Sequence, residues 1–167
     1  MGDKTCLDLD RLWSEVTDYL GDDMRRINHA KSVLDYAKEI LKSQKADRET
    51  VEVAAMLHDI GIHEAERKYS SCAGHYQELE GPPIARNMLE RLNADSALID
   101  HVCKIIACHH SPGEMNTPEF YILWDSDWLV NIPDEYPNAE PEELSRLIDK
   151  VFQTSKGREL AIKLLNI

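Results

Sequence analysis

The sequence lacks the features of a disulfide-rich, secreted or membrane-spanning protein. Its 167 residues include only four cysteines and no CxxC pair, so we expect reduced thiols and a cytoplasmic location. No apolar run approaches the roughly 18 residues that a membrane-spanning helix needs. The first ten residues, MGDKTCLDLD, lack the basic-then-apolar order of a signal peptide.

Basic residues are also scarce. The chain has 19 Lys and Arg against 31 Asp and Glu, which gives a formal net charge of −12. A surface of this kind repels phosphate polymers and anionic lipid headgroups, so we expect no nucleic-acid polymer and no membrane as partner. A small anionic substrate is compatible with this charge if a metal or a local basic group offsets it. The sequence does not fix the oligomeric state.

A convincing strand pattern is missing too, so we predict an all-α fold in a single domain over residues 1–167. Apolar residues spaced three and four apart indicate the helices. These are expected at residues 9–20, 23–44, 47–60, 82–92, 96–110 and 118–131, with two closing helices in 141–167 that are split near Gly157. Residues 61–81 contain three glycines and are expected to form a long functional loop. Pro82 and Pro83 suit the first turn of the helix that follows.

Histidines and carboxylates occupy inward-facing positions on these helices. His29 lies at the edge of an apolar stripe, where a lone histidine is usually a core residue. His58 faces inward and Asp59 follows it, and a buried carboxylate needs a cation beside it. In the last long apolar helix, periodicity does not show whether Asp125 or Asp127 is the better ligand. Two imidazoles and two carboxylates suit Mn, Fe, Co, Ni or Zn, with Mg as a further option.

A second group of histidines ends the helix expected at 96–110. The side chains of His109 and His110 point about 100° apart on a helix, so both can serve one site only at the helix end. A histidine pair alone is more often structural than ligating.

The order of these residues resembles the HD superfamily of metal-dependent phosphohydrolases. The matching stretches are NHAKSVLDYAKEIL, VAAMLHDIGI, EGPPIARNMLERL, IIACHHSP and LWDSDWL, over roughly residues 25–131. The resemblance implies an all-helical HD-domain bundle with a divalent transition metal. It implies four metal ligands, which are His29, His58, Asp59 and Asp127. The resemblance favours Asp127 because the last aspartate of the superfamily directly precedes a short "x-Leu" segment, which is Trp128-Leu129 here, and Asp125 would then lie beside a ligand.

Some members of that superfamily hold a second metal. His109 and His110 match the histidine pair of this second site, but the family's remaining histidine falls on Gln77 here. His75, two residues away, is a substitute candidate, and one metal is better supported than two. The superfamily often has a lysine at the position that Ile62 occupies here. No GYP motif follows the histidine pair, and this absence argues against cyclic-di-GMP hydrolysis.

The resemblance implies hydrolysis of a small phosphate ester such as a nucleotide. Asp59 is expected to orient the attacking water, with Asp125 or a nearby histidine as the alternate base. Arg67, Lys68 and Arg86 are candidates for phosphate contacts, although any one of them is more typical of plain surface charge. Two alternatives stay open: a di-iron oxygenase of the same fold, and a non-catalytic module that senses a nucleotide or another ligand.

Overall fold

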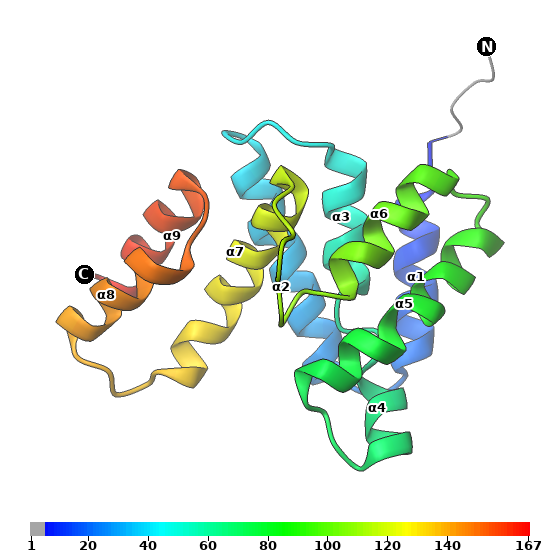
Figure 1. The fold of residues 1–167 in the computed structure, drawn as a ribbon, viewed down its shortest axis with the longest axis horizontal. Helices are drawn as coiled ribbons and strands as arrows, with labels where there is room; N and C mark the ends of the chain where they lie inside the picture. Colours follow the sequence, from blue (N-terminus) through cyan, green and yellow to red (C-terminus); the bar gives the residue numbers. More distant parts are fainter. Residues whose placement is uncertain (1–5) are drawn as a thin grey trace.

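The computed structural model describes residues 6–167, and this part of the chain consists of helices and connections without a β-strand (Figure 1). The prediction of an all-α fold is confirmed. The helices are α1 (Leu9–Leu20), α2 (Met24–Leu41), α3 (Arg48–Leu57), α4 (Ile62–Tyr69), α5 (Gly74–Arg91), α6 (Ser96–Ile106), α7 (Pro118–Glu135), α8 (Pro141–Val151) and α9 (Ser155–Leu165). Within residues 6–167, no helix is long and apolar enough to cross a membrane.

Short polar side chains begin several of these helices. Each accepts a hydrogen bond from the backbone N–H three residues further on, which satisfies a donor that the first helical turn leaves without a partner. The capping residues are Asp8, Asp23, Asp47, Thr117 and Thr154. The helix starts are therefore encoded locally, by residues that the sequence places just before each apolar pattern.

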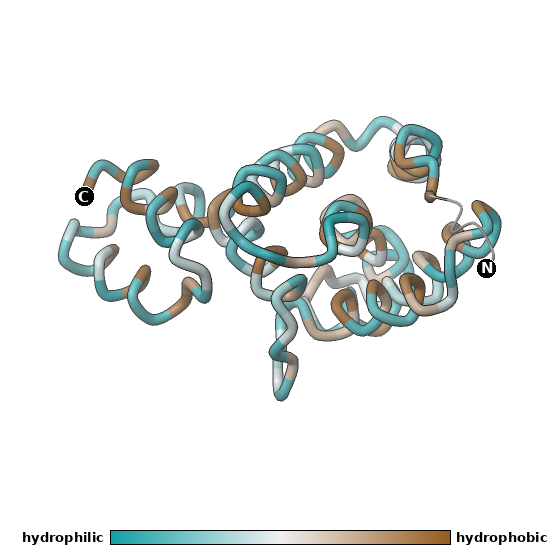
Figure 2. Tube along the Cα trace, turned by 90° about the horizontal axis from the view of Figure 1, so that it is seen from above, coloured by the Kyte–Doolittle hydropathy of each residue, from teal (hydrophilic) through white to brown (hydrophobic). Residues whose placement is uncertain are grey.

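Helix α2 lies in the middle of the bundle. It packs against α3 and α7, while α3 also contacts α6, and α5 packs on α4 and α6. Apolar and polar residues alternate along most of the helices (Figure 2), whereas α3 is buried on nearly all sides, from Thr50 to Leu57. The largest fully buried side chains come from α1, α2, α3, α5, α6, α7 and the turn after α3, and include Leu12, Ile40, Leu57, Ile60, Leu89, Ile106 and Phe120. This packing brings α2, α6, α7 and the end of α3 together around one point.

The closing helices α8 and α9 form a hairpin beside α7, on the side away from α1 (Figure 1). A buried carboxylate connects the two parts: Asp125 on α7 accepts hydrogen bonds from the backbone N–H groups of Gln153 and Thr154 and from the Thr154 hydroxyl. Burial raises the pKa of Asp125 to about 6, although these hydrogen bonds favour its charged form. Gly157 contacts the same carboxylate, and any Cβ there would collide with it.

The boundaries of three segments differ from expectation. The closing helices separate at residues 152–154, and Gly157 lies in the first turn of α9. Helix α7 continues past residue 131 to Glu135, through Pro133. Helix α6 ends at Ile106, so the histidine pair lies in the turn that follows it.

The expectation of a long loop over residues 61–81 is wrong. This segment contains α4 and the first turns of α5, and Pro82 and Pro83 lie inside α5 instead of starting it. A proline inside a helix removes one backbone hydrogen bond, but α5 is packed on α4 and α6. Tertiary packing of this kind outweighs the local signals of glycine and proline.

Candidate metal centre

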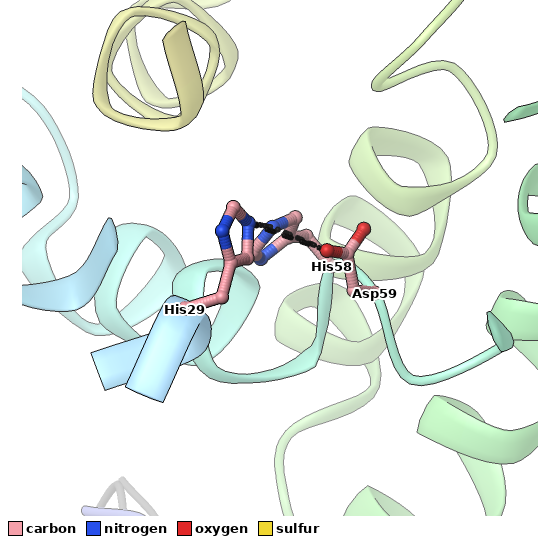
Figure 3. Close-up of side chains that lie close together, drawn as sticks. All are labelled: His29, His58 and Asp59. Carbon is pink, nitrogen blue, oxygen red and sulfur yellow. Dashed lines mark hydrogen bonds and ion pairs between the residues drawn. The ribbon is translucent and has the colours of Figure 1, made fainter. Parts of the chain in front are cut away.

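Two histidines and a carboxylate converge where α2 meets the turn after α3 (Figure 3). His29 comes from α2, whereas His58 and Asp59 follow the last residue of α3. The Nε2 atoms of His29 and His58 are 3.2 Å apart, and Asp59 Oδ2 lies 3.3 Å from each of them. These three ligand atoms are close enough to share one metal ion.

Asp127 on α7 adds a second carboxylate to this group. Its Oδ1 lies 3.0 Å from His29 Nε2 and 3.4 Å from His58 Nε2. The side-chain amide of Asn131, one helical turn further on, donates to the same oxygen at 3.0 Å. The structure thus brings together the four residues that the resemblance implies as ligands. We call them the HD cluster.

The proton on the His58 ring points away from the HD cluster. His58 is fully buried, and its Nδ1 donates to the carbonyl oxygen of Ala55 at 2.8 Å. In the neutral ring this leaves the lone pair of Nε2 directed at His29, Asp59 and Asp127. Carboxylates are acceptors only, so acceptors outnumber donors at this point and a cation is required between them. The donor set fits a divalent transition metal.

The electrostatics of the cluster also favour a cation. Burial opposes the charged form of His58, but the carboxylates of Asp59 and Asp127 raise its pKa well above the ordinary histidine value. Burial opposes the charged form of Asp59 as well, but His58 and His109 lower its pKa well below the ordinary aspartate value. Asp127 behaves likewise, because hydrogen bonds with His29 and His58 lower its pKa against the effect of burial. All three shifts thus have the same cause, which is the close approach of imidazoles and carboxylates.

A second group of ligand atoms shares Asp59 with the first. It consists of Asp59, His109 and His110. His109 Nε2 lies 3.2 Å from Asp59 Oδ1, while His109 Nδ1 donates to the carbonyl oxygen of Ile106 at 2.7 Å. The two oxygens of Asp59 therefore face different histidines.

A cleft of about 380 Å³ opens over the HD cluster. His29, Asp59 and Asn131 line it, together with Arg25 and Arg26 from the first turn of α2. Its volume is within the range of small-molecule sites. A ligand in this cleft would lie directly against the HD cluster.

The sequence matches the family model of the HD domain over residues 26–151. The chain belongs to the HD domain family. Its fold is similar to the crystal structure of a predicted HD superfamily hydrolase from an uncultured Thermotogales bacterium, with a TM-score of 0.71 and 23% sequence identity. That similarity covers 98% of this chain and 88% of the other. No curated protein matches the chain significantly.

Asp125 lies outside the HD cluster, so the expectation that it serves there as an alternate base is wrong. Residues two apart on a helix point in nearly opposite directions, because each residue turns the helix by about 100°. Asp127 thus faces α2 and α3, whereas both oxygens of Asp125 bond to Gln153 and Thr154. Asp125 connects the closing hairpin to α7.

His75 also lies outside both ligand groups, contrary to its suggested role at a second metal. It is exposed, and its ring packs on that of Tyr76 with the centroids 4.0 Å apart. Gln77 is buried instead, with its side-chain oxygen 3.5 Å from His110 Nε2. The helix turn that α5 adopts here points residue 77, and not residue 75, toward the histidine pair.

The three cations proposed for phosphate contacts lie elsewhere. Arg67, Lys68 and Arg86 are paired with the carboxylates of Glu64, Glu80 and Asp100, respectively, and none of the three lines the cleft. Arg25 and Asn131, which do line it, were not singled out from the sequence. Arg25 lies four residues before His29 on α2, and Asn131 lies four residues after Asp127 on α7. Residues four apart share a face of a helix, so this spacing could have indicated both residues from the sequence.

Proposed function

We propose that this protein is a metal-dependent phosphohydrolase that releases phosphate from a small phosphate ester, with nucleotides as its substrate class. The observation that carries this proposal is the convergence of the HD cluster on one point beneath an open cleft. Membership of the HD domain family and the fold shared with a predicted HD superfamily hydrolase support it.

The four residues of the HD cluster would hold the first ion, which is Mn, Fe, Co, Ni or Zn, with Mg as a further option. His109 and His110 would take a second ion together with Asp59, with Gln77 beside His110. When bound, a divalent metal polarises a phosphoryl oxygen and lowers the pKa of a water molecule from 15.7 toward about 7.

The protein's own groups would position the reactants. With only the first ion bound, Asp59 Oδ1, which faces His109 while Oδ2 faces His29 and His58, would accept a hydrogen bond from the attacking water and take its proton. Asn131 fixes Asp127 through its side-chain amide. Because His58 is anchored to Ala55, its ring cannot turn away from the cluster.

Phosphate release from a panel of nucleotides and simple phosphate esters tests this proposal. The purified protein would be assayed with Mn, Co or Ni, both in air and without oxygen. We expect release at equal rates in both atmospheres, and a loss of about a hundredfold or more in His58→Ala, since even groups that only orient ligands are worth 10- to 100-fold. His101→Ala is the matched control, because His101 contacts Thr117 and Glu119 away from the cluster.

The two alternatives give different results in the same assay. Strict dependence on Fe(II) and dioxygen, with no phosphate released from any ester, would favour a di-iron oxygenase that uses the second ligand group. Binding of a nucleotide that raises the melting temperature, without turnover under any metal, would favour a sensing module.

A further inference from the structure

The ring of His110 lacks the backbone anchor that two other histidines of the site have. His58 Nδ1 and His109 Nδ1 each donate to the backbone carbonyl oxygen three residues earlier, at 2.8 and 2.7 Å. His110 is exposed, and within residues 6–167 the hydrogen-bonding contact of its ring is to the side-chain oxygen of Gln77 at 3.5 Å. This distance is too long for a strong hydrogen bond. Other contacts must therefore fix the position of His110.

The backbone of His110 is held by Glu78 on α5. Glu78 Oε1 accepts hydrogen bonds from the backbone N–H groups of His110 at 2.9 Å and Ser111 at 2.6 Å. Both N–H groups lie in the turn that follows α6. Hydrogen bonds to a charged acceptor are stronger than those between neutral groups. Glu78 therefore fixes this turn from the side of α5.

The ring of His110 packs against Gly74, the first residue of α5. A Cβ at residue 74 would lie 2.7 Å from His110 Cγ and 2.9 Å from His110 Cδ2, which is closer than Cβ atoms approach such neighbours in proteins. The ring also contacts that of His109, with the ring centroids 4.0 Å apart. The histidine pair therefore keeps its arrangement only if residue 74 has no side chain.

These contacts come from one face of α5. Gly74, Gln77 and Glu78 are spaced three and four residues apart from Gly74, so they lie on the same side of the helix. Gln77 Nε2 donates to the carbonyl oxygen of Cys72 at 2.6 Å, which directs the side-chain oxygen of Gln77 toward His110. We call Gly74, Gln77 and Glu78 the His110 seat. The seat meets the ring, a ring nitrogen and the backbone of a single histidine.

We propose that Glu78 and Gly74 are positioning residues that hold His110 in place to bind a second ion. The ligand atoms of Asp59, His109 and His110 lie within 4.8 Å of one another, and the seat keeps His110 at this distance. The inference rests on the proposed function, in which these three residues take the second ion. Glu78 and Gly74 do not bind the ion themselves and act through His110.

Titration of the metal-free protein with Co²⁺ tests the inference, with binding followed by isothermal calorimetry and by the visible absorption of the bound ion. We expect the wild type to bind two ions in two steps, the tighter one at the HD cluster. Glu78→Ala should weaken the second step by roughly 10- to 100-fold, the usual effect of losing a group that orients a ligand, and leave the first step unchanged. Glu78→Gln should restore most of the loss, because its amide oxygen can accept the same two hydrogen bonds.

Glu90→Ala is the matched control, because Glu90 is an exposed carboxylate on the same helix. It should bind both ions as the wild type does. Urea unfolding of both variants separates positioning from stability. A Glu78→Ala variant that is less stable than Glu90→Ala but binds both ions equally well would show that Glu78 only stabilises the fold, and would overturn its positioning role.

Gly74→Ala tests the seat without removing a hydrogen bond. The added methyl group meets the ring of an exposed histidine, which can turn toward solvent, so stability should change little while the second step weakens. Combined with His110→Ala, it should cause no further loss beyond that of His110→Ala alone, because Gly74 acts through His110. A second step in Gly74→Ala equal to that of the wild type, or a further loss in the double variant, would overturn the role of Gly74.

Failure of this inference differs from failure of the proposed function. A wild-type protein that binds a single ion and releases phosphate would overturn the inference and leave the hydrolase in place. Two bound ions with the expected response of Glu78→Ala, but no phosphate released from any ester, would overturn the proposed function and leave the positioning role. A single ion without phosphate release would overturn both.

Discussion

Two aspartates on one helix have different tasks. Asp125 and Asp127 are two residues apart on α7, and both are surrounded by apolar neighbours in the sequence. Asp127 meets His29 and His58, whereas Asp125 accepts three hydrogen bonds at the start of α9. The helix turn between them separates a candidate ligand from a group that stabilises the fold.

The pair of variants Asp127→Asn and Asp125→Asn separates these tasks. Asp127→Asn should lose most of the co-purifying metal at little cost in stability, because an amide is a poor ligand but similar in shape. Asp125→Asn should keep its metal and lose about 1–3 kcal/mol of unfolding free energy, because its amide group would oppose the N–H donors of Gln153 and Thr154. Elemental analysis and urea unfolding measure the two effects.

The reverse order of metal loss, at equal helicity by circular dichroism, would move the ligand role from Asp127 to Asp125. His58→Ala serves as the reference for a protein without the HD cluster. If His58→Ala contained as much metal as the wild type, the assignment of the HD cluster as the metal site would be contradicted.

At the scale of the elements, the turn between α3 and α4 positions the cluster. It contains His58 and Asp59, and it brings Gly61 into close contact with the backbone of α5. A Cβ on Gly61 would lie 2.5 Å from the backbone nitrogen of Gly81 and 2.8 Å from the carbonyl oxygen of Gln77. The close approach of these two backbones fixes the turn relative to the histidine pair, since Gln77 also faces His110.

Gly61→Ala should therefore destabilise the protein more than Gly81→Ala. At Gly61 the added methyl group meets backbone atoms, which cannot move aside without shifting α5, and we expect a loss of about 3 kcal/mol, at the upper end for overpacking. At Gly81 the nearest atom is Cγ2 of the buried Ile106 side chain, and the nearest backbone atom is 3.7 Å away, so the clash displaces one side chain and leaves the backbone in place. The gain in helix propensity, about 1 kcal/mol for Gly to Ala, offsets part of that clash.

Urea unfolding of both glycine variants checks this order. Equal losses for Gly61→Ala and Gly81→Ala would mean that the two backbones are not in close contact. Metal content of Gly61→Ala, measured on the folded fraction, would show in addition whether the turn must keep its position for the HD cluster to bind.

At the scale of the whole molecule, the HD cluster joins segments that are far apart in the sequence. His29, His58 and Asp127 come from α2, the end of α3 and α7, so an ion shared among them connects three parts of the bundle. The carboxylates of Asp59 and Asp127 lie beside the same two histidines and repel each other. A bound cation should therefore stabilise the folded chain as well as serve its chemistry.

Removal of the metal should lower the melting temperature of the wild-type protein. An ion present at about 100 times its Kd contributes about 2.7 kcal/mol, which corresponds to a shift of about 5–10 °C for a chain of this size. Differential scanning calorimetry before and after chelation, followed by addition of Mn or Co, measures the shift and its recovery. His58→Ala is the control and should show no response to the metal, and an equal response in both proteins would place the ion elsewhere.

The helices and the order of the ligands could be predicted from the sequence, because both depend on local patterns. Spacings of three and four residues indicated α2, α3 and α7, and capping residues such as Asp47 and Thr117 lie directly before their helices. His58 and Asp59 are neighbours in the chain, so their proximity did not depend on the fold. Local signals failed in residues 61–81, where packing against α6 and close contact between Gly61 and Gly81 keep α5 helical.

Only the tertiary structure decided which side chains share the site. Periodicity shows that a residue faces inward, but the angle between packed helices determines what it faces. Asp125 therefore meets α9, whereas Asp127 meets His29. In the same way, Gln77 and not His75 reaches His110, and Arg25 lines the cleft while Arg67 is paired on α4. The sequence by itself determined the helices other than α4 and the first turns of α5, together with the candidate ligands, and the packing of α2, α3, α6 and α7 around one point decided the composition of the site.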